Sequence, residues 1–169
     1  MSVVFRDAGV ADAGVLGILG ARSFTETFGH LYTPQNLAAF LQCHAPESWT
    51  GELTDPRFAV RLGEVAGEAV AYAKLGPAKL PFTPPEGAIE LKQFYVLTPW
   101  HGAGVAAEMM DWVLAESRRR GAAELYLSVF VDNHRAQAFY ARYGFERVGA
   151  YAFMVGDHED EDHVMRLAL

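Results

Sequence analysis

Two closely spaced glycines, Gly102 and Gly104, connect an expected strand to an expected helix within the stretch from His101 to Ala107. Glycine lets the backbone approach a ligand closely. The helix that follows begins with unpaired N–H groups and a partial positive charge, so the connection suits an anion such as a phosphate. A tight connection that binds nothing would use the same glycines, and the loop alone does not decide between the two interpretations.

The same glycines match the dinucleotide-binding pattern G-x-G-x-x-[GA], but their surroundings argue against that function. That pattern has its first glycine at the end of the strand, whereas five residues separate Val96 from Gly102. It also has an acidic residue about 20 positions later that holds the ribose. Glu124 has this distance but precedes the next expected strand, where it would point away from the loop. No Gly-Lys-Ser/Thr follows, so a Walker-type loop is excluded.

A second stretch, Asn133 to Phe145, places small and aromatic residues at helical intervals. Ala136 and Tyr140 are four positions apart and therefore share a helix face. The small side chain of Ala136 would let a ligand pass close to the helix, and Tyr140 would project its hydroxyl past that gap. A core tyrosine is the alternative interpretation, and we prefer it for Tyr143.

The elements that must position these residues follow from hydrophobic spacing and turn residues. Strands are expected at 3–6, 58–62, 68–75, 89–97, 125–131, 145–155 and 163–169. Helices are expected at 12–28, 34–41, 105–120 and 133–143, with a short helix or turn at 47–53. This order predicts one α/β (α+β) domain over residues 1–169, with a mixed, mostly antiparallel sheet of about seven strands and helices on both faces.

Charge and hydropathy exclude several classes of partner. The net charge is -7, which argues against nucleic acid, since nucleic acid is bound by neutralising phosphates. No apolar segment is long enough to span a membrane, and the N-terminal residues lack the pattern of a signal peptide. We therefore expect a cytoplasmic protein that binds a small molecule, and an acidic protein concentrates small cations around itself.

The residues from Asp157 to His163 are all acidic or histidine, which raises the question of a metal site. Metal ligands must be spaced so that their side chains converge, and these residues are consecutive. We therefore predict a solvated hairpin turn between the last two strands, and no metal.

The two stretches together resemble the GNAT superfamily of N-acetyltransferases. The phosphate loop of that family reads [QR]-x-x-G-x-[GA], and the chain matches it from His101 to Ala106 except at the first position, where it has histidine. The later family motif reads N-x-x-A-x-x-x-Y-x-x-x-G-F, and it matches at every fixed position: Asn133, Ala136, Tyr140, Gly144 and Phe145. The resemblance covers nearly the whole chain, and the expected strand order agrees with it.

The N-terminal half is similar to the bacterial spermidine/spermine N-acetyltransferase-like branch of that family. The stretches that carry this similarity are 24–29, 32–37 and 153–165. The strand before the glycine loop often reads E-L-E-R-I-Y-V in that branch, and the chain departs from it at Lys92 and Gln93. Lys92 would place a positive charge close to where a cationic substrate should bind.

The resemblance implies acetyl-CoA as co-substrate, no metal, and transfer of the acetyl group to a primary amine by direct attack in a ternary complex. Tyr140 would protonate the leaving thiolate. Glu90 would be the base, with Glu26 or a water chain as the alternative. The residues implied to bind the cofactor are Phe94, Tyr95, Val96, His101, Gly102, Ala103, Gly104, Val105, Ala106, Ala107, Asn133, Ala136 and Tyr140. Those implied to bind the substrate are Glu26, Phe28, Tyr32 and Lys92.

The resemblance leaves the acceptor open. A polyamine or another small cationic amine is the first expectation. A protein N-terminus and an antibiotic are alternatives, and so is a regulatory module that binds acyl-CoA without turning it over. A homodimer is also left open.

Overall fold

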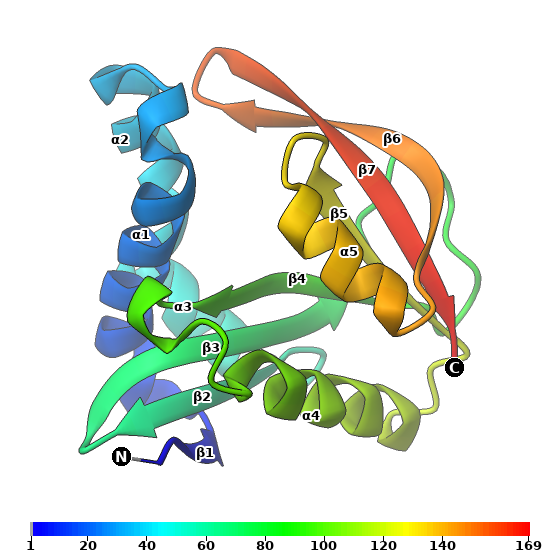
Figure 1. Ribbon diagram of the computed structural model, residues 1–169, viewed down its shortest axis with the longest axis horizontal. Helices are drawn as coiled ribbons and strands as arrows, with labels where there is room; N and C mark the ends of the chain where they lie inside the picture. The colour runs from blue at the N-terminus through cyan, green and yellow to red at the C-terminus, as the bar shows by residue number, and fades with distance from the viewer. Residues whose placement is uncertain (1) are drawn as a thin grey trace.

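Seven strands form one sheet in the computed structural model, which describes residues 2–169 (Figure 1). The strand order is β1-β2-β3-β4-β5-β7-β6, and β4 and β5 form the one parallel pair between the described strands. The predicted mixed, mostly antiparallel sheet is therefore confirmed. The strands are β1 Val4–Asp7, β2 Ala59–Val65, β3 Glu68–Pro77, β4 Ile89–Val96, β5 Glu124–Phe130, β6 Glu146–Val155 and β7 His158–Ala168.

Five α-helices accompany the described strands, and two of them, α2 and α5, begin at side-chain caps that the sequence predicts. The side chain of Thr33 accepts the Asn36 N–H at 3.2 Å, and Pro34 follows at the first helical position. Asn133 accepts the Ala136 N–H at 3.3 Å in the same way. The helices are α1 Ala13–Phe28, α2 Pro34–Leu41, α3 Pro46–Leu53, α4 Val105–Arg119 and α5 His134–Arg142. No helix within residues 2–169 is long and apolar enough to cross a membrane.

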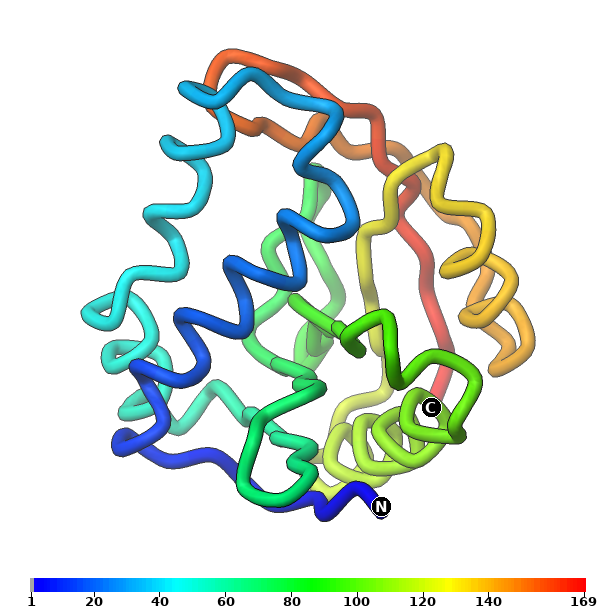
Figure 2. The backbone as a smooth tube through the Cα atoms, turned by 60° about the vertical axis from the view of Figure 1, so that its left-hand side comes forward, coloured from blue at the N-terminus to red at the C-terminus, as the bar shows by residue number. Residues whose placement is uncertain are grey.

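The helices cover both faces of the sheet, as predicted. Trp49 of α3 packs edge-on against Tyr72 of β3, with ring centroids 5.6 Å apart. Trp112 of α4 lies instead against Arg61, which pairs in the sheet with Ala73. Neighbouring residues of a strand point to opposite faces, so α3 and α4 lie on opposite sides. Helix α1 contacts α3 and shares its side. Figure 2 shows the N-terminal helices well separated from α4 and α5.

Strands β4 and β5 pair only at their first residues and then separate. Their register consists of Ile89 opposite Leu125 and Glu90 opposite Tyr126. The pairing of β3 with β4 shifts by one residue, so that Lys92 is the extra residue of a β-bulge. A bulge bends its strand and ends regular pairing. The sheet therefore opens between the second half of β4 and β5, and the β4 backbone there has no strand partner on that side.

The predicted hairpin between the last two strands is present, but the predicted solvated turn over residues 157–163 is wrong. Only Gly156 and Asp157 separate β6 from β7, so most of the acidic stretch belongs to a strand that pairs with β5 and β6. Alternate residues of a strand share a face, and Asp160 and Asp162 are accordingly both buried. The tip of this hairpin meets α2, where the Asp157 N–H donates to Asn36 Oδ1 at 3.0 Å (Figures 1 and 2).

Close packing of α1 on the segment before α3 gives a stability prediction. A Cβ on Gly20 would overlap the ring of His44, which is buried and accepts a hydrogen bond from Trp49 Nε1 at 3.3 Å. Because that ring is held in place, Gly20→Ala should lower the free energy of unfolding by about 1–3 kcal/mol, the usual cost of overpacking. The measurement is denaturant unfolding.

Gly14→Ala is the matched control, since Gly14 lies on the same helix and a Cβ there meets no atom within 4 Å. It should leave stability unchanged or raise it by up to about 1 kcal/mol through helix propensity. Equal stability of the two variants would contradict the packing of Gly20 on His44.

Candidate active site

The glycine loop after β4 forms an open anion site at the start of α4. Gly102 and Gly104 have φ of 76° and 82°, a region that disfavours residues with a Cβ. A Cβ on either glycine would meet no atom within 4 Å, so both face open space. Gly104 is the N-cap, and the first helical hydrogen bond is donated by the Glu108 N–H to the Gly104 carbonyl at 3.2 Å. The amides of residues 105–107 therefore remain available to a phosphate.

His101 and Arg135 join this loop to α5. Arg135 Nη1 lies 2.5 Å from His101 Nδ1, and His101 Nε2 lies 2.6 Å from the Val96 carbonyl. An arginine can only donate, so Nδ1 accepts and Nε2 carries the proton that is donated to Val96. Sequence reasoning did not single out Arg135. The sequence feature that could have identified it is its position two residues after the cap Asn133. That position puts Arg135 in the first turn of α5, at the end that faces the loop.

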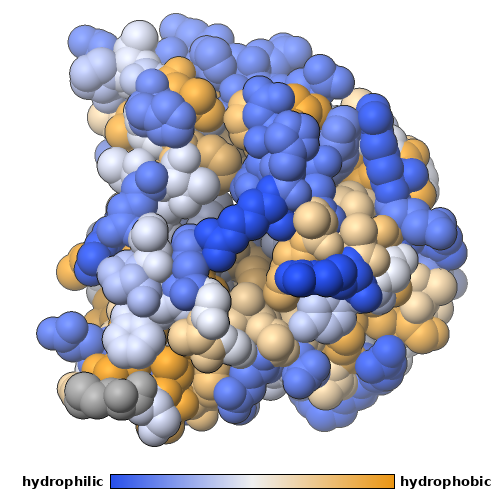
Figure 3. Space-filling model, viewed as in Figure 1, coloured by the Kyte–Doolittle hydropathy of each residue, from blue (hydrophilic) through white to orange (hydrophobic). Residues whose placement is uncertain are grey.

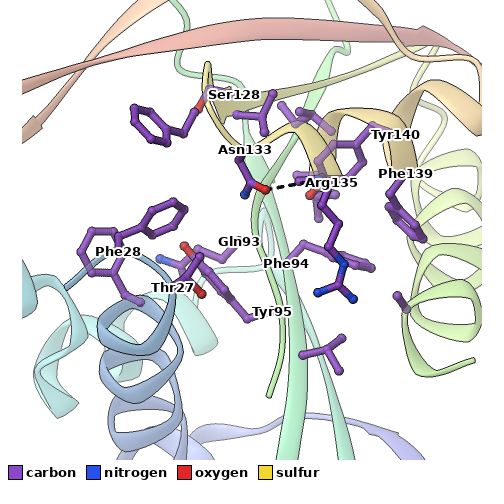
Figure 4. Close-up of a pocket in the computed structure, with 18 of the residues that line it drawn as sticks. Thr27, Phe28, Gln93, Phe94, Tyr95, Ser128, Asn133, Arg135, Phe139 and Tyr140 are labelled. Atoms are coloured by element: carbon purple, nitrogen blue, oxygen red, sulfur yellow. Dashed lines mark hydrogen bonds between the residues drawn. The ribbon is translucent and has the colours of Figure 1, made fainter. Parts of the chain in front are cut away.

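A cavity of about 620 Å³ occupies the opening between β4 and β5. A hollow is visible near the middle of the face shown in Figure 3, and Figure 4 shows Thr27 and Phe28 across from Asn133, Arg135 and Tyr140. Many of the predicted residues line the cavity: Phe28, Tyr32, Lys92, Phe94, Tyr95, Val96, His101, Gly102, Gly104, Ala106, Ala107, Asn133, Ala136 and Tyr140. Those outside the lining are Glu26, Glu90, Ala103 and Val105.

Tyr140 projects from α5 into an aromatic surround at the edge of this cavity. The rings of Phe94, Phe139 and Phe145 lie with centroids 5.6–6.3 Å from its own. Burial raises the pKa of Tyr140 above its usual value of 10. The hydroxyl therefore keeps its proton at neutral pH, which suits a proton donor.

The two predicted bases lie away from the cavity. Glu90 lines a second hollow of about 330 Å³, where Oε1 accepts the Lys79 N–H at 2.9 Å and lies 3.4 Å from Lys92 Nζ. Glu26 forms an ion pair with Arg22 at 2.9 Å on α1. The structure therefore does not bring either carboxylate together with Tyr140, and each has a cation beside it.

Two carboxylates that sequence reasoning missed line the main cavity instead. Asp160 accepts a short hydrogen bond from the Tyr32 hydroxyl and lies 3.0 Å from His158 Nε2. Asp162 lies two residues further along the same face of β7. Burial raises the pKa of Asp162 to about 7, the charge of Asp160 adds to the shift, and the Ser128 hydroxyl opposes it.

The cavity connects the two faces of the sheet. Phe94 packs on Phe139 of α5, whereas the next residue of β4, Tyr95, packs on Tyr72 on the α3 side. The glycine loop and Tyr140 thus lie at one end of the opening, and Asp160 lies at the other, beside α1. This arrangement can hold an anionic cofactor at one end and a cation at the other. Within residues 2–169, no group of three or more His, Cys, Asp or Glu side chains is placed to hold a metal ion.

Comparison with known proteins connects this geometry to one family. The model of the acetyltransferase (GNAT) family matches residues 22–145. Uncharacterized N-acetyltransferases of Mycobacterium bovis and Mycobacterium tuberculosis are 34% identical over 157 residues, which cover 92% of this chain and 97% of each relative. These matches support an N-acetyltransferase and do not identify an acceptor.

Solved structures agree on the fold. The PaiA N-acetyltransferase of Thermoplasma acidophilum in complex with coenzyme A has a TM-score of 0.79 at 14% identity, covering 100% of both chains. The ribosomal-protein-S18-alanine N-acetyltransferase of Escherichia coli has a TM-score of 0.72 at 15% identity, covering 99% of this chain and 94% of that one. At these identities the similarity concerns the fold alone.

Proposed function

The chain belongs to the acetyltransferase (GNAT) family, and from this premise we propose that it transfers the acetyl group of acetyl-CoA to the primary amine of a small cationic molecule. The observation that carries the proposal is the continuous cavity between β4 and β5. It has free helix-terminal amides at one end and two buried carboxylates at the other. An anionic cofactor and a cationic acceptor can therefore occupy the same cavity, with Tyr140 at the cofactor end.

The residues fit acetyl-CoA at three places. The amides from Gly102 to Ala107 would hold the pyrophosphate, with Arg135 adding a guanidinium that pairs well with phosphate. The β4 backbone from Phe94 to Val96 would take the extended pantetheine arm as an added strand, since β5 does not pair with it there. Asn133 uses its Oδ1 to cap α5, so its amide N–H groups remain for the arm.

Acetyl-CoA, when bound, supplies the acetyl thioester, and the chain positions the amine and manages the protons. An alkyl amine has a pKa of about 10, so a carboxylate or a water chain must take its proton at neutral pH. The Tyr140 hydroxyl supplies the proton that the sulfur needs when the carbon–sulfur bond breaks. No covalent bond between enzyme and acetyl group is required, and Cys43 has no part in the scheme.

A small amine is favoured over a protein N-terminus, an antibiotic or a regulatory module without turnover. A module that only binds acyl-CoA needs neither a buried tyrosine hydroxyl nor buried carboxylates at the far end of the cavity. The net charge of -7 disfavours nucleic acid as a partner. The proposal also takes the cytoplasm as the site of action and involves no membrane. Sedimentation of the purified protein would decide between a monomer and a homodimer.

An acetyl-transfer screen tests the acceptor class. Spermidine represents the polyamines and 2-phenylethylamine represents apolar monoamines, and both are compared with aminoglycosides and a panel of N-terminal peptides. For a cationic amine we expect kcat/KM to fall as salt rises, because the acidic protein attracts the amine electrostatically and salt screens that attraction. The measurement is the initial rate at two ionic strengths.

The outcome separates the acceptors. If both small amines are inert while one peptide is acetylated efficiently and in a sequence-dependent way, the acceptor is a protein N-terminus. If 2-phenylethylamine reacts and spermidine does not, the enzyme acts on amines but not on polyamines. A protein that binds acetyl-CoA and acetylates no member of the screen would instead fit the regulatory module.

A further inference from the structure

The two carboxylates on the α1 side of the cavity differ in what surrounds them. Asp160 and Asp162 are only 7% and 6% exposed. Each oxygen of Asp160 has a partner, since the Tyr32 hydroxyl donates to Oδ2 and His158 Nε2 lies 3.0 Å from Oδ1. Asp162 has no cation beside it within residues 2–169, and the groups that act on its pKa are Asp160 and the Ser128 hydroxyl. Asp162 is therefore a buried carboxylate that faces the cavity and is free to take a ligand.

We propose that Asp162 is the base that takes the proton from the ammonium group of the acceptor, and that Asp160 completes the ammonium site. The inference rests on the proposed function and deepens it. It assigns the acceptor end of the cavity and replaces the strand-borne Glu90 as the base. It also gives the Tyr32–Asp160 hydrogen bond a positioning role, because that bond fixes the second carboxylate.

Burial and the charge of Asp160 suit Asp162 to this task. They raise its pKa from the ordinary value of 3.8 to about 7. An alkylammonium group has a pKa of about 10, so the gap between donor and acceptor falls from about six units to about three. Proton transfer is thereby made less unfavourable by about 10³-fold. At neutral pH a large share of Asp162 is still ionised and able to accept the proton.

The groups that face Asp162 from the elements packed around it favour a cation. Tyr32 comes from the segment between α1 and α2 and Tyr95 from β4, and burial raises the pKa of both, so both are neutral near pH 7. The Ser128 hydroxyl of β5 hydrogen-bonds to Asp162, and Tyr151 of β6 lies opposite it in the sheet. On β7 itself, the Asp160 carboxyl lies 3.0 Å from His158 Nε2. Lys92 of β4 is the cation on the nearby wall, and it is paired with Glu90.

Aromatic rings complete the ammonium site. The ring of Phe130 lies 6.1 Å from that of Phe28 in an edge-on arrangement, and Phe153 lies 5.4 Å from Phe40. All four line the cavity, and aromatic faces attract cations. An ammonium group carried on an apolar body fits this end of the cavity, which is why 2-phenylethylamine is a useful probe beside spermidine.

The reaction then balances as follows. The ammonium group gives one proton to Asp162, and the neutral nitrogen forms a bond to the acetyl carbonyl carbon. The carbon–sulfur bond breaks, and the sulfur receives the proton of Tyr140. The nitrogen loses its second proton, which restores Tyr140 through water, and Asp162 releases its proton to solvent. The products are the acetylated amine, the free thiol and one proton.

The test is Asp162→Asn, assayed with spermidine and 2-phenylethylamine from about pH 5 to about pH 10. For the wild type, kcat/KM should rise with pH and level off above an apparent pKa near 7, because Asp162 must be ionised to accept a proton. For the variant, kcat/KM at pH 7 should be about 10²-fold lower. It should keep rising towards pH 10 as the free amine becomes abundant. Affinity for acetyl-CoA should not change.

Glu161→Gln is the matched control, since it removes the same charge from the opposite, exposed face of β7. It should keep the wild-type pH profile. If Asp162→Asn lowers kcat/KM by the same factor at every pH, the assignment is overturned. A fully active variant would overturn it as well. The pKa of Asp162 can also be measured in the wild type by carboxyl NMR titration, which does not depend on how well the variant folds. An ordinary pKa near 4 would also overturn the assignment.

Failure of the proposed function would look different. In that case the wild type would acetylate neither amine, whatever residue 162 is, and the inference would fall with it. An active wild type whose pH profile survives Asp162→Asn would overturn the inference alone.

Discussion

Gly104→Val is expected to abolish acetyl-CoA binding and to leave the fold in place. Gly104 has φ of 82° and is the N-cap of α4, so a β-branched side chain disturbs both the turn and the amides that follow it. Its Cβ would point into open space, where the ligand must approach. The loss comes from the blocked anion site, because no other protein atom lies within 4 Å to be displaced.

The matched control is Gly121→Val at the other end of the same helix. Gly121 has φ of 77°, and a Cβ there also meets no atom within 4 Å. The two variants share the backbone strain, of order 1–2 kcal/mol, and differ in their distance from the loop. Calorimetric titration with acetyl-CoA should show binding for Gly121→Val and none for Gly104→Val, while circular dichroism shows both folded. Unchanged affinity of Gly104→Val would remove the phosphate site from the loop.

The glycine loop and the helix cap could be predicted because local chemistry decides them. Positive φ at Gly102 and Gly104 is a property of glycine itself, and Asn133 caps α5 through a contact only three residues away. The same holds for Thr33 and Pro34 at the start of α2. Caps and glycine turns depend on residues only a few positions apart, so they can be read from the sequence.

The carboxylates of β7 could not be predicted because tertiary structure decides their surroundings. Asp160 and Asp162 lie in a stretch whose charge is typical of a solvated turn. They are buried because β7 is inserted between β5 and β6, and because Tyr32 reaches Asp160 from 128 residues away. The one available signal was their spacing of two, which places side chains on one face of a strand.

Glu90 is a residue whose predicted role the structure does not support. The resemblance assigned it a role from its position on the strand before the loop, but position alone does not say where a side chain points. In the structure its carboxylate lies in the second hollow beside Lys92, the residue at which β4 bulges. Glu90→Gln, measured beside Asp162→Asn, would show which of the two carboxylates the amine depends on.

Tyr140→Phe is expected to lower kcat by about 10²-fold or more, the usual scale of general acid catalysis. The change keeps the ring and its contacts with Phe94, Phe139 and Phe145 and removes only the hydroxyl. Packing around α5 is therefore preserved, and the Kd of acetyl-CoA should change little. Steady-state kinetics and calorimetry, run on the same preparation, measure the two quantities.

Tyr143→Phe is the matched control for that loss. Tyr143 directly follows α5, its ring packs on Phe139, and it does not line the cavity. It should keep full activity, so a loss confined to Tyr140→Phe reports the hydroxyl at the reacting sulfur. Because burial raises the pKa of Tyr140 above 10, the wild type should lose this donor only at pH values above 10. A Tyr140→Phe variant with wild-type kcat would show that water protonates the sulfur, and Tyr140 would then serve only to shape the cavity.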